Sequence, residues 1–149
     1  MIIQNAVKVI DKKKNIYIKS AYTHDFVTYN FSNGKSIHLD GGYSYFKRGG
    51  NLELFEDTSK IICYSLVESS TIADVLEKLL WGTRGKDEEQ PLTYKPIKDL
   101  ELEHLKAILE YNFEIFEMSP LHIFVINYWI KEKTEGARKQ LDKDFLKKR

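Results

Sequence analysis

The chain has 149 residues, of which 42% are hydrophobic and 13% aromatic; this excludes a disordered chain and suffices for one domain with one core. A formal net charge of +1 gives no bulk attraction to nucleic acid or to an anionic membrane. The single cysteine excludes an internal disulfide and a multi-cysteine metal site. The opening residues lack a signal-peptide pattern and no run reaches the roughly 20 apolar residues of a membrane span. We therefore expect a cytoplasmic protein with no membrane contact.

The N-terminal part carries the alternation of apolar and polar residues that is typical of strands. The alternation at residues 7–9 resumes at residues 16–18, and the lysine-rich stretch between them favours a turn. Asn33-Gly34 predicts a hairpin, because both residue types accept positive φ. Glycines at 41–42 and 49–50 predict breaks. The remaining predicted strand segments are residues 26–31, 37–39, 52–55 and 61–67.

At Ser70 the hydrophobic period changes to that of a helix. The apolar residues from Ile72 to Leu80 share one helical face, which predicts a helix capped by Ser70 or Thr71 and ended by Gly82. A loop is predicted to follow, over residues 82–98.

Two further helices are predicted, one starting near Asp99 and one at Pro120, since proline suits the first helical position. The elements together predict an α+β fold in one domain, residues 1–149. Its antiparallel β-rich part is expected over residues 1–68 and its mainly helical part over residues 69–149.

His24 and Asp25 could be a general base with an orienting carboxylate. Adjacent strand residues point to opposite faces, so the alternative is that Asp25 bonds a nearby turn while His24 stays half exposed. No serine, cysteine or threonine stands in a nucleophile motif, and the other histidines lack metal-ligand spacing. Cys63 lies in an apolar segment and is expected to be a buried small hydrophobe. We expect no catalysis, no metal and no cofactor.

Residues 40–50 combine the residue types that a nucleotide site requires. Glycines let the backbone approach a ligand and bind an anion. Tyr43 and Tyr45 offer ring faces for a base, and Lys47 and Arg48 could hold phosphate. The segment is not a phosphate-loop signature, and the alternative is a hairpin turn with surface charges.

Residues 81–87 form a second such segment, in which two glycines are interspersed with Trp81, Thr83, Arg84 and Lys86. An aromatic ring and two cations in a glycine-containing loop suit an anion site. The alternative is that the cations only complement the dipole at the end of the preceding helix.

The C-terminal region contains an apolar and a charged segment. Residues 121–130 are apolar nearly all round, which indicates a helix that is buried centrally or packed against a second protomer. The tail, residues 131–149, interleaves basic and acidic residues and is interpreted as a solvated helix with i,i+4 pairs.

Part of the chain resembles small phage-encoded proteins of mostly unknown function. The residues that carry this resemblance are Asn5-Ala6-Val7, His24-Asp25-Phe26-Val27, Asp40-Gly41-Gly42, Tyr45, Lys47-Arg48, Trp81-Gly82-Thr83, Gly85-Lys86-Asp87, Pro91-Leu92, Glu103-His104-Leu105 and Ala107-Ile108-Leu109. Many of those proteins carry cysteine pairs after the first two stretches, as in a zinc ribbon. The matching places here hold Val9, the lysine turn, Tyr29 and Phe31, so the resemblance implies core packing in place of zinc.

In size and residue make-up the chain also resembles the anti-Thoeris sponge family of phage proteins, which sequester a cyclic ADP-ribose signal of bacterial immunity without cleaving it. The resemblance implies a non-enzymatic viral anti-defence protein in the cytoplasm of the bacterial host. It also implies a small nucleotide signal as partner, a homodimer or higher homo-oligomer, arginine clamps and aromatic stacking. The expected ligand-binding residues are His24, Phe26, Tyr43, Tyr45, Lys47, Arg48, Trp81, Thr83, Arg84 and Lys86.

Other functions stay open at this point. The chain could be a protein-binding inhibitor of a host defence enzyme or nuclease that acts through its apolar C-terminal helix, and the sequence does not separate this alternative from the sponge. The near-neutral charge counts against a nucleic-acid binder derived from a zinc ribbon. An enzyme that uses His24 and Asp25 lacks a nucleophile or metal motif.

Overall fold

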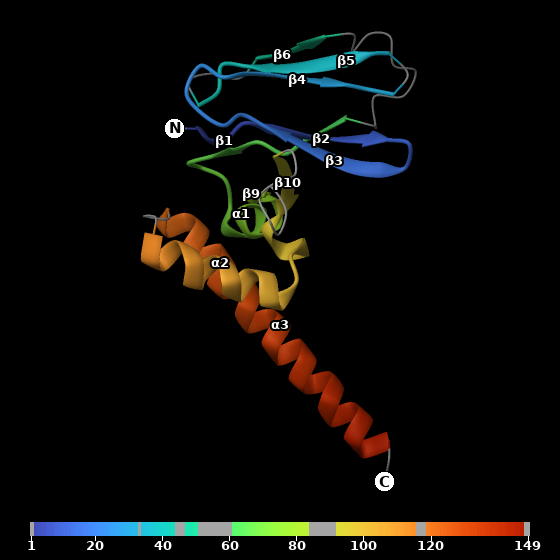
Figure 1. Ribbon diagram of the computed structural model, residues 1–149, viewed down its shortest axis with the longest axis vertical. Helices are drawn as coiled ribbons and strands as arrows, with labels where there is room; N and C mark the ends of the chain where they lie inside the picture. The colour runs from blue at the N-terminus through green and yellow to red at the C-terminus, as the bar shows by residue number, and fades with distance from the viewer. Residues whose placement is uncertain are drawn as a thin grey trace. The chain divides into compact units, whose positions relative to one another are not determined.

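The computed structural model describes residues 2–32, 34–43, 47–50, 61–83, 92–115 and 119–147, with only the backbone of residues 47–50, 112–115 and 147. The predicted α+β class is confirmed: strands in antiparallel sheets precede the long helices (Figure 1). In chain order the elements are β1 Ile2–Gln4, β2 Ala6–Asp11, β3 Lys14–Lys19, β4 Phe26–Asn30, β5 Ser36–Asp40, β6 Lys47–Gly50, β7 Ile61–Cys63, β8 Leu66–Val67, α1 Ile72–Lys78, β9 Leu80–Thr83, β10 Thr93–Pro96, the 3-10 helix η3 Ile97–Asp99, α2 Leu102–Ile115 and α3 Pro120–Lys147.

The chain divides into two compact units, Met1–Lys95 and Pro96–Arg149. The first unit therefore includes α1, β9 and most of β10, in addition to the N-terminal strands. The change of hydrophobic period at Ser70 does not coincide with this division.

In the first unit, β2 and β3 form the predicted hairpin, with Val9 opposite Ile16. Lys12 and Lys13 adopt positive φ (50° and 64°) in its turn. This hairpin is the centre of a sheet with the strand order β7-β2-β3-β10-β9 in the described part of the chain. A short pair, β1 with β8, accompanies it.

A second antiparallel sheet has the order β4-β5-β6. The predicted β4–β5 hairpin is confirmed, with Gly34 at φ 86° in its loop; Asn33 lies outside the described residues, as does the predicted strand at 52–55. The prediction that Gly49 and Gly50 break the chain is wrong, because they pair with His38 and Ile37 as part of β6. Strand pairing uses backbone groups alone, so glycine is tolerated in an outer strand.

The two sheets pack face to face around the core of the first unit (Figure 1). The alternation of each strand supplies one apolar face, and these faces meet. The buried members of this core are Val7, Val9 and Ile18 from one sheet and Phe31, Ile37 and Leu39 from the strands and loop of the other. The prediction that Cys63 is buried is wrong: its side chain is exposed, because β7 is at the edge of its sheet.

Helix α1 ends earlier than predicted, and the reason is the fully buried side chain of Gln4. Gln4 Nε2 donates to the carbonyl of Lys78 at 2.8 Å and to that of Tyr64 at 2.7 Å, while Oε1 accepts the N–H of Leu80 at 2.9 Å. These bonds satisfy the carbonyl of the last residue of α1 and the N–H of Leu80, on either side of the extended Leu79, so the helix ends at Lys78 and β9 begins at Leu80. Gly82 is therefore inside a strand and does not stop a helix. The predicted loop over residues 82–98 is also wrong where β10 and η3 form.

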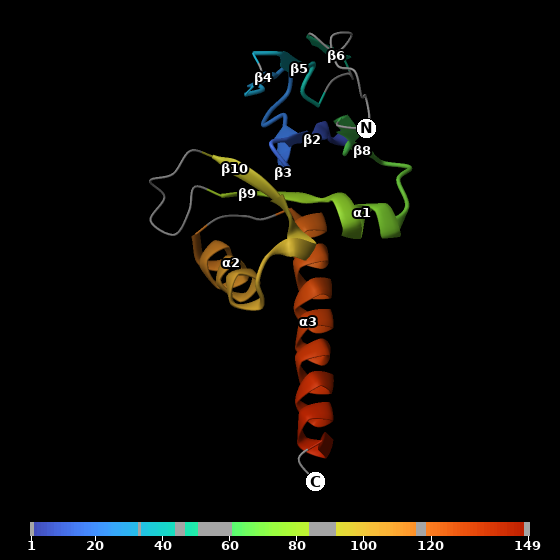
Figure 2. The ribbon, with the colours of Figure 1, turned by 90° about the vertical axis from the view of Figure 1, so that its right-hand side faces the viewer.

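In the second unit, α2 packs along the first half of α3 (Figure 2). The buried residues of these helices include Leu105 and Ile108 from α2 and Val125 and Ile126 from α3. Pro120 begins α3 as predicted, and the charged tail continues the same helix through Lys147. No helix in the described ranges is long and apolar enough to cross a membrane.

Candidate functional site

Asp25 holds a turn between β3 and β4. Its side chain is 5% exposed, and Oδ2 accepts the N–H of Ala21 at 2.7 Å. His24 is exposed and has a positive φ of 62°. The alternative in which Asp25 bonds a turn is therefore confirmed, and His24 is more exposed than that alternative expected.

The glycines after β5 pack against this same turn. The N–H of Gly41 donates to the carbonyl of Asp25 at 3.1 Å. Gly42 has a φ of 55°, and a Cβ there would lie 2.1 Å from the carbonyl oxygen of Tyr22. Only glycine permits this approach. The structure thus joins two segments that the sequence analysis treated as separate.

Lys19, at the end of β3, connects these segments to a pair of tyrosines. Its Nζ donates to Tyr43 Oη at 2.6 Å and to the carbonyl of Ser20 at 2.9 Å. The ammonium also lies 5.5 Å from the ring centroid of Tyr94, which is in the cation–π range. Its contact with Tyr43 is the hydrogen bond to the hydroxyl group at the edge of the ring. Sequence analysis missed Lys19 and Tyr94, because strand alternation marks a lysine only as polar.

The segment that contains Trp81 and Thr83, on β9, lies next to Tyr94, the second tyrosine beside Lys19. A Cβ on Gly82 would lie 2.9 Å from the ring of Tyr94, so the backbone of β9 is close to that ring. Thr83 accepts a hydrogen bond at its carbonyl from Thr93 Oγ1 at 3.4 Å, and Trp81 is half-buried. We call Lys19, Tyr43 and Tyr94 the lysine–tyrosine cluster. Arg84, Lys86 and Tyr45 lie outside the described residues.

Phe26, the first residue of β4, presents an exposed aromatic face. Its side chain is 57% exposed and stacks on His38, with ring centroids 4.9 Å apart and planes inclined by 28°. This pair is on the face of the β4-β5-β6 sheet that does not carry the core. His38 is a further residue that the sequence analysis did not select. The hairpin pairs His38 with Thr28, which is two positions after Phe26, so the hairpin register alone places His38 on the same face as Phe26.

The two predicted cations of β6 occupy successive register positions. Lys47 is opposite Asp40, which in turn is opposite Phe26. Arg48 is opposite the buried Leu39. Because neighbouring positions of a strand alternate between its faces, Lys47 and Arg48 do not occupy equivalent places on the sheet.

Polar contacts at the far end of the first hairpin tie the two sheets together. Asp11 accepts hydrogen bonds from Ser32 Oγ at 2.7 Å and from Tyr29 Oη at 2.9 Å. The side-chain bond from Ser32 is the main cause that keeps the pKa of Asp11 below its usual value. Burial, followed by the bond to Asp11, raises the pKa of Tyr29 to about 12. These groups stabilise the fold, and none belongs to the lysine–tyrosine cluster.

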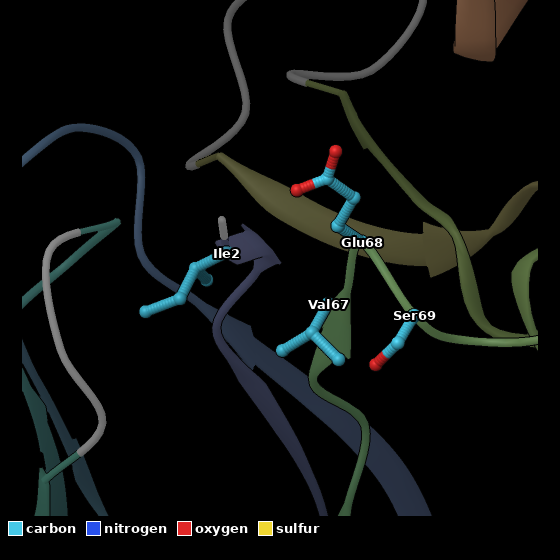
Figure 3. A pocket seen from close by; sticks show the side chains of 4 residues that line it. All are labelled: Ile2, Val67, Glu68 and Ser69. Carbon is cyan, nitrogen blue, oxygen red and sulfur yellow. The ribbon is translucent and has the colours of Figure 1, made fainter.

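A pocket of about 460 Å³ lies beside β1 and β8. Figure 3 shows its lining residues Ile2, Val67, Glu68 and Ser69. None of its lining residues within the described part of the chain is an expected ligand-binding residue, and the carboxylate of Glu68 disfavours an anionic ligand. The described lining of this pocket therefore favours no phosphate there. Comparison of the chain with models of protein families, with curated proteins and with solved structures gives no match.

Proposed function

We propose that the protein binds a small phosphorylated nucleotide, with the lysine–tyrosine cluster as its phosphate site and the exposed Phe26–His38 pair as its stacking surface, and that it releases the ligand intact. The observation that carries the proposal is the convergence of three segments with nucleotide-binding residue types on Lys19. These segments are the turn at His24, the glycines before Tyr43 and the strand that carries Trp81.

Lys19 supplies the charge that a phosphate requires. Its two hydrogen bonds use two of the three donors of an ammonium, and the third donor suits a phosphate oxygen. Lys19 is half-buried between the Tyr43 hydroxyl and the Tyr94 ring, and reduced exposure to solvent strengthens the attraction of the ammonium for an anion. The cations predicted from the sequence to add to it are Arg84 and Lys86 together with one of Lys47 and Arg48, because these two occupy alternate positions of β6.

The Phe26–His38 pair supplies a stacking surface for the base. A ring that is 57% exposed on a strand has a face open to a planar ligand. Stacking of a base on an aromatic side chain contributes about 1–3 kcal/mol. Phe26 directly follows Asp25, whose carbonyl bonds Gly41, so the stacking surface adjoins the glycine turn.

The resemblance to the sponge family supports a ligand that is sequestered without turnover. In this proposal the ligand is a cyclic ADP-ribose isomer, and the protein acts as a viral anti-defence protein in the cytoplasm of the bacterial host. A homo-oligomer would then complete the enclosure of the ligand.

The test is calorimetry with cyclic ADP-ribose isomers and with cyclic di- and trinucleotides, followed by recovery of the ligand after heat denaturation. A charge-assisted contact contributes about 1.5–3 kcal/mol, so Lys19→Met and Arg48→Ala should each weaken binding about ten- to hundredfold. Phe26→Ala should weaken binding about tenfold or more through lost stacking. Lys143→Met, the same change on the exposed face of α3, should leave affinity unchanged.

Thermal unfolding of each variant separates binding from folding. If Lys19→Met lowers the melting temperature but the folded variant keeps full affinity, Lys19 has only a structural role and the proposed site is wrong. An absence of binding to every nucleotide tested rejects the proposed function. Recovery of a cleaved ligand would show an enzyme, and His24 would be the first residue to replace.

A further inference from the structure

The second half of α3 carries an uncharged stripe along one face. Ile130, Thr134, Ala137, Leu141 and Phe145 recur at intervals of three and four residues, which places them on one side of a helix. We call these residues the distal stripe. The side chains of Leu141 and Phe145 are 69% and 59% exposed, and Ile130 is half-buried. In Figure 1 and Figure 2 this half of α3 continues beyond α2.

The sizes of these side chains indicate what can pack on the stripe. Large residues, Ile130 at one end and Leu141 with Phe145 at the other, flank the small Thr134 and Ala137. Small residues allow a second helix to approach closely, while the large ones pack into its grooves. From Ile130 to Phe145 the stripe is roughly 22 Å long, about the length of four helical turns. The stripe therefore matches a partner helix.

The charges beside the stripe indicate the chemistry of that partner. Lys131 and Arg138 border it on one side and Lys133 on the other. One carboxylate, Asp144, also borders it and accepts a hydrogen bond from Gln140 Nε2 at 3.1 Å. A second copy docked by the same stripe would bring these cations against one another, which is unfavourable. A helix with acidic flanks places carboxylates beside the cations.

A membrane surface is a less suitable occupant. An interfacial helix buries a broad face of large apolar and aromatic residues in lipid. The distal stripe is narrow, and Thr134 and Ala137 contribute little apolar area to it. Carboxylates of Glu132, Glu135 and Asp142 also lie on the remainder of this half of the helix, and an anionic bilayer repels them.

We propose that the distal stripe docks an acidic amphipathic helix of a partner protein, with Leu141 and Phe145 packed between the partner's apolar residues and the bordering cations paired with its carboxylates. This surface shares no residue with the lysine–tyrosine cluster. A protein that fails to bind nucleotide can therefore still bind the helix, and the two proposals fail independently.

The experiment uses the full chain and two fluorescein-labelled 28-residue peptides that have leucine at both core positions of each heptad. One carries glutamate at the flanking positions and the other carries lysine. Fluorescence anisotropy should show binding of the glutamate peptide at least about tenfold tighter than that of the lysine peptide, from a few exposed charge pairs. Leu141→Glu and Phe145→Glu should remove this binding, with helix content unchanged in circular dichroism.

A charge-matched pair of variants tests the location of the site. Arg138→Glu, beside the stripe, should weaken glutamate-peptide binding about tenfold and improve lysine-peptide binding. Lys143→Glu makes the same change of charge away from the stripe and should alter neither. Equal effects of the two variants, or equal binding of both peptides, would overturn the proposal.

Two other occupants give their own contrary results. A dimer in sedimentation that Leu141→Glu dissociates would identify a second copy as the occupant. Binding to vesicles of phosphatidylglycerol and phosphatidylcholine that depends on Phe145, without peptide binding, would identify a membrane surface. Either result would replace the acidic helix.

Discussion

Replacing Gln4 with methionine is expected to destabilise the first unit strongly, because one buried amide holds three backbone segments together. The side chain is fully buried and bonds the carbonyls of Tyr64 and Lys78 and the N–H of Leu80. Methionine has a similar length and shape but can form none of these bonds. The substitution therefore leaves three backbone groups without their hydrogen-bond partner, while the packing around the side chain changes little.

The magnitude follows from counting these groups. Each lost hydrogen bond with a buried partner costs about 1 kcal/mol or more, so Gln4→Met should lower the free energy of unfolding by about 3 kcal/mol. This is a large share of the 5–15 kcal/mol that is typical of a domain. Gln4→Glu should be more damaging at neutral pH, because a buried carboxylate would face two carbonyl oxygens. Part of its loss should be recovered in acid, where the carboxyl is protonated.

The assay is urea unfolding followed by the fluorescence of Trp81, which is on β9 next to Leu80. A Trp129→Phe background removes the other tryptophan of the sequence, which belongs to the second unit. Gln140→Met is the matched control, because Gln140 is exposed on α3, and it should change stability by less than about 0.5 kcal/mol. A decrease of less than about 1 kcal/mol in the free energy of unfolding of Gln4→Met, or one no larger than that of the control, would show that the Gln4 amide does not hold these segments together.

Four further predictions concern the glycine turn, the acid and the alkaline dependence of stability, and the oligomeric state. Gly42→Ala should destabilise the protein by well over about 1 kcal/mol, because the new Cβ would overlap the carbonyl oxygen of Tyr22. Gly34→Ala is the control, since Gly34 has positive φ but open space around it, and it should cost about 1 kcal/mol; equal melting temperatures of the two variants would contradict this. Because the pKa of Asp11 is lowered, its contribution to stability is present above pH 3.8 and is lost as the pH falls through the folded-state pKa. Urea midpoints of Asp11→Asn should therefore depend less on pH in this acid range than those of wild type, and an equal dependence would show that Asp11 does not cause the acid loss. The pKa of Tyr29 is raised from 10.0 to about 12, so its contribution to stability is full below pH 10 and is lost as the pH rises to about 12. Tyr29→Phe should therefore lose less stability than wild type over this range, and an equal loss in both proteins would assign it to other groups. Light scattering should show a homodimer or larger assembly that uses residues 120–130, where Phe124 is 52% exposed. Phe124→Glu should dissociate this assembly and Lys139→Glu should not, and a wild-type monomer at micromolar concentration would contradict the prediction.

The elements that could be predicted are those with a local cause. The alternation of apolar residues in β2 and β3 reports which side of a strand each residue occupies, whatever its neighbours are. Pro120 marks the start of α3 because a proline at the first helical position loses no required N–H. Two residues of the glycine- and aromatic-rich segment, residues 40–50, also lie as expected. Gly42 is in a turn with positive φ, and Tyr43 accepts a hydrogen bond from the cation of Lys19.

The ends of elements and the composition of the candidate site have causes that are distant in the chain. The N–H of Leu80 bonds a glutamine 76 positions earlier, and this bond, which has no local signal, begins a strand where the helical period continues. Lys19 becomes a candidate ligand-binding residue only because Tyr43 and Tyr94 come to lie within 5.5 Å of its ammonium. Side-chain period is a property of consecutive residues, so the sequence alone determined which faces are apolar and the α+β class. Contacts between residues far apart depend on how those faces pack, so only the tertiary structure decided where α1 ends and which residues surround Lys19.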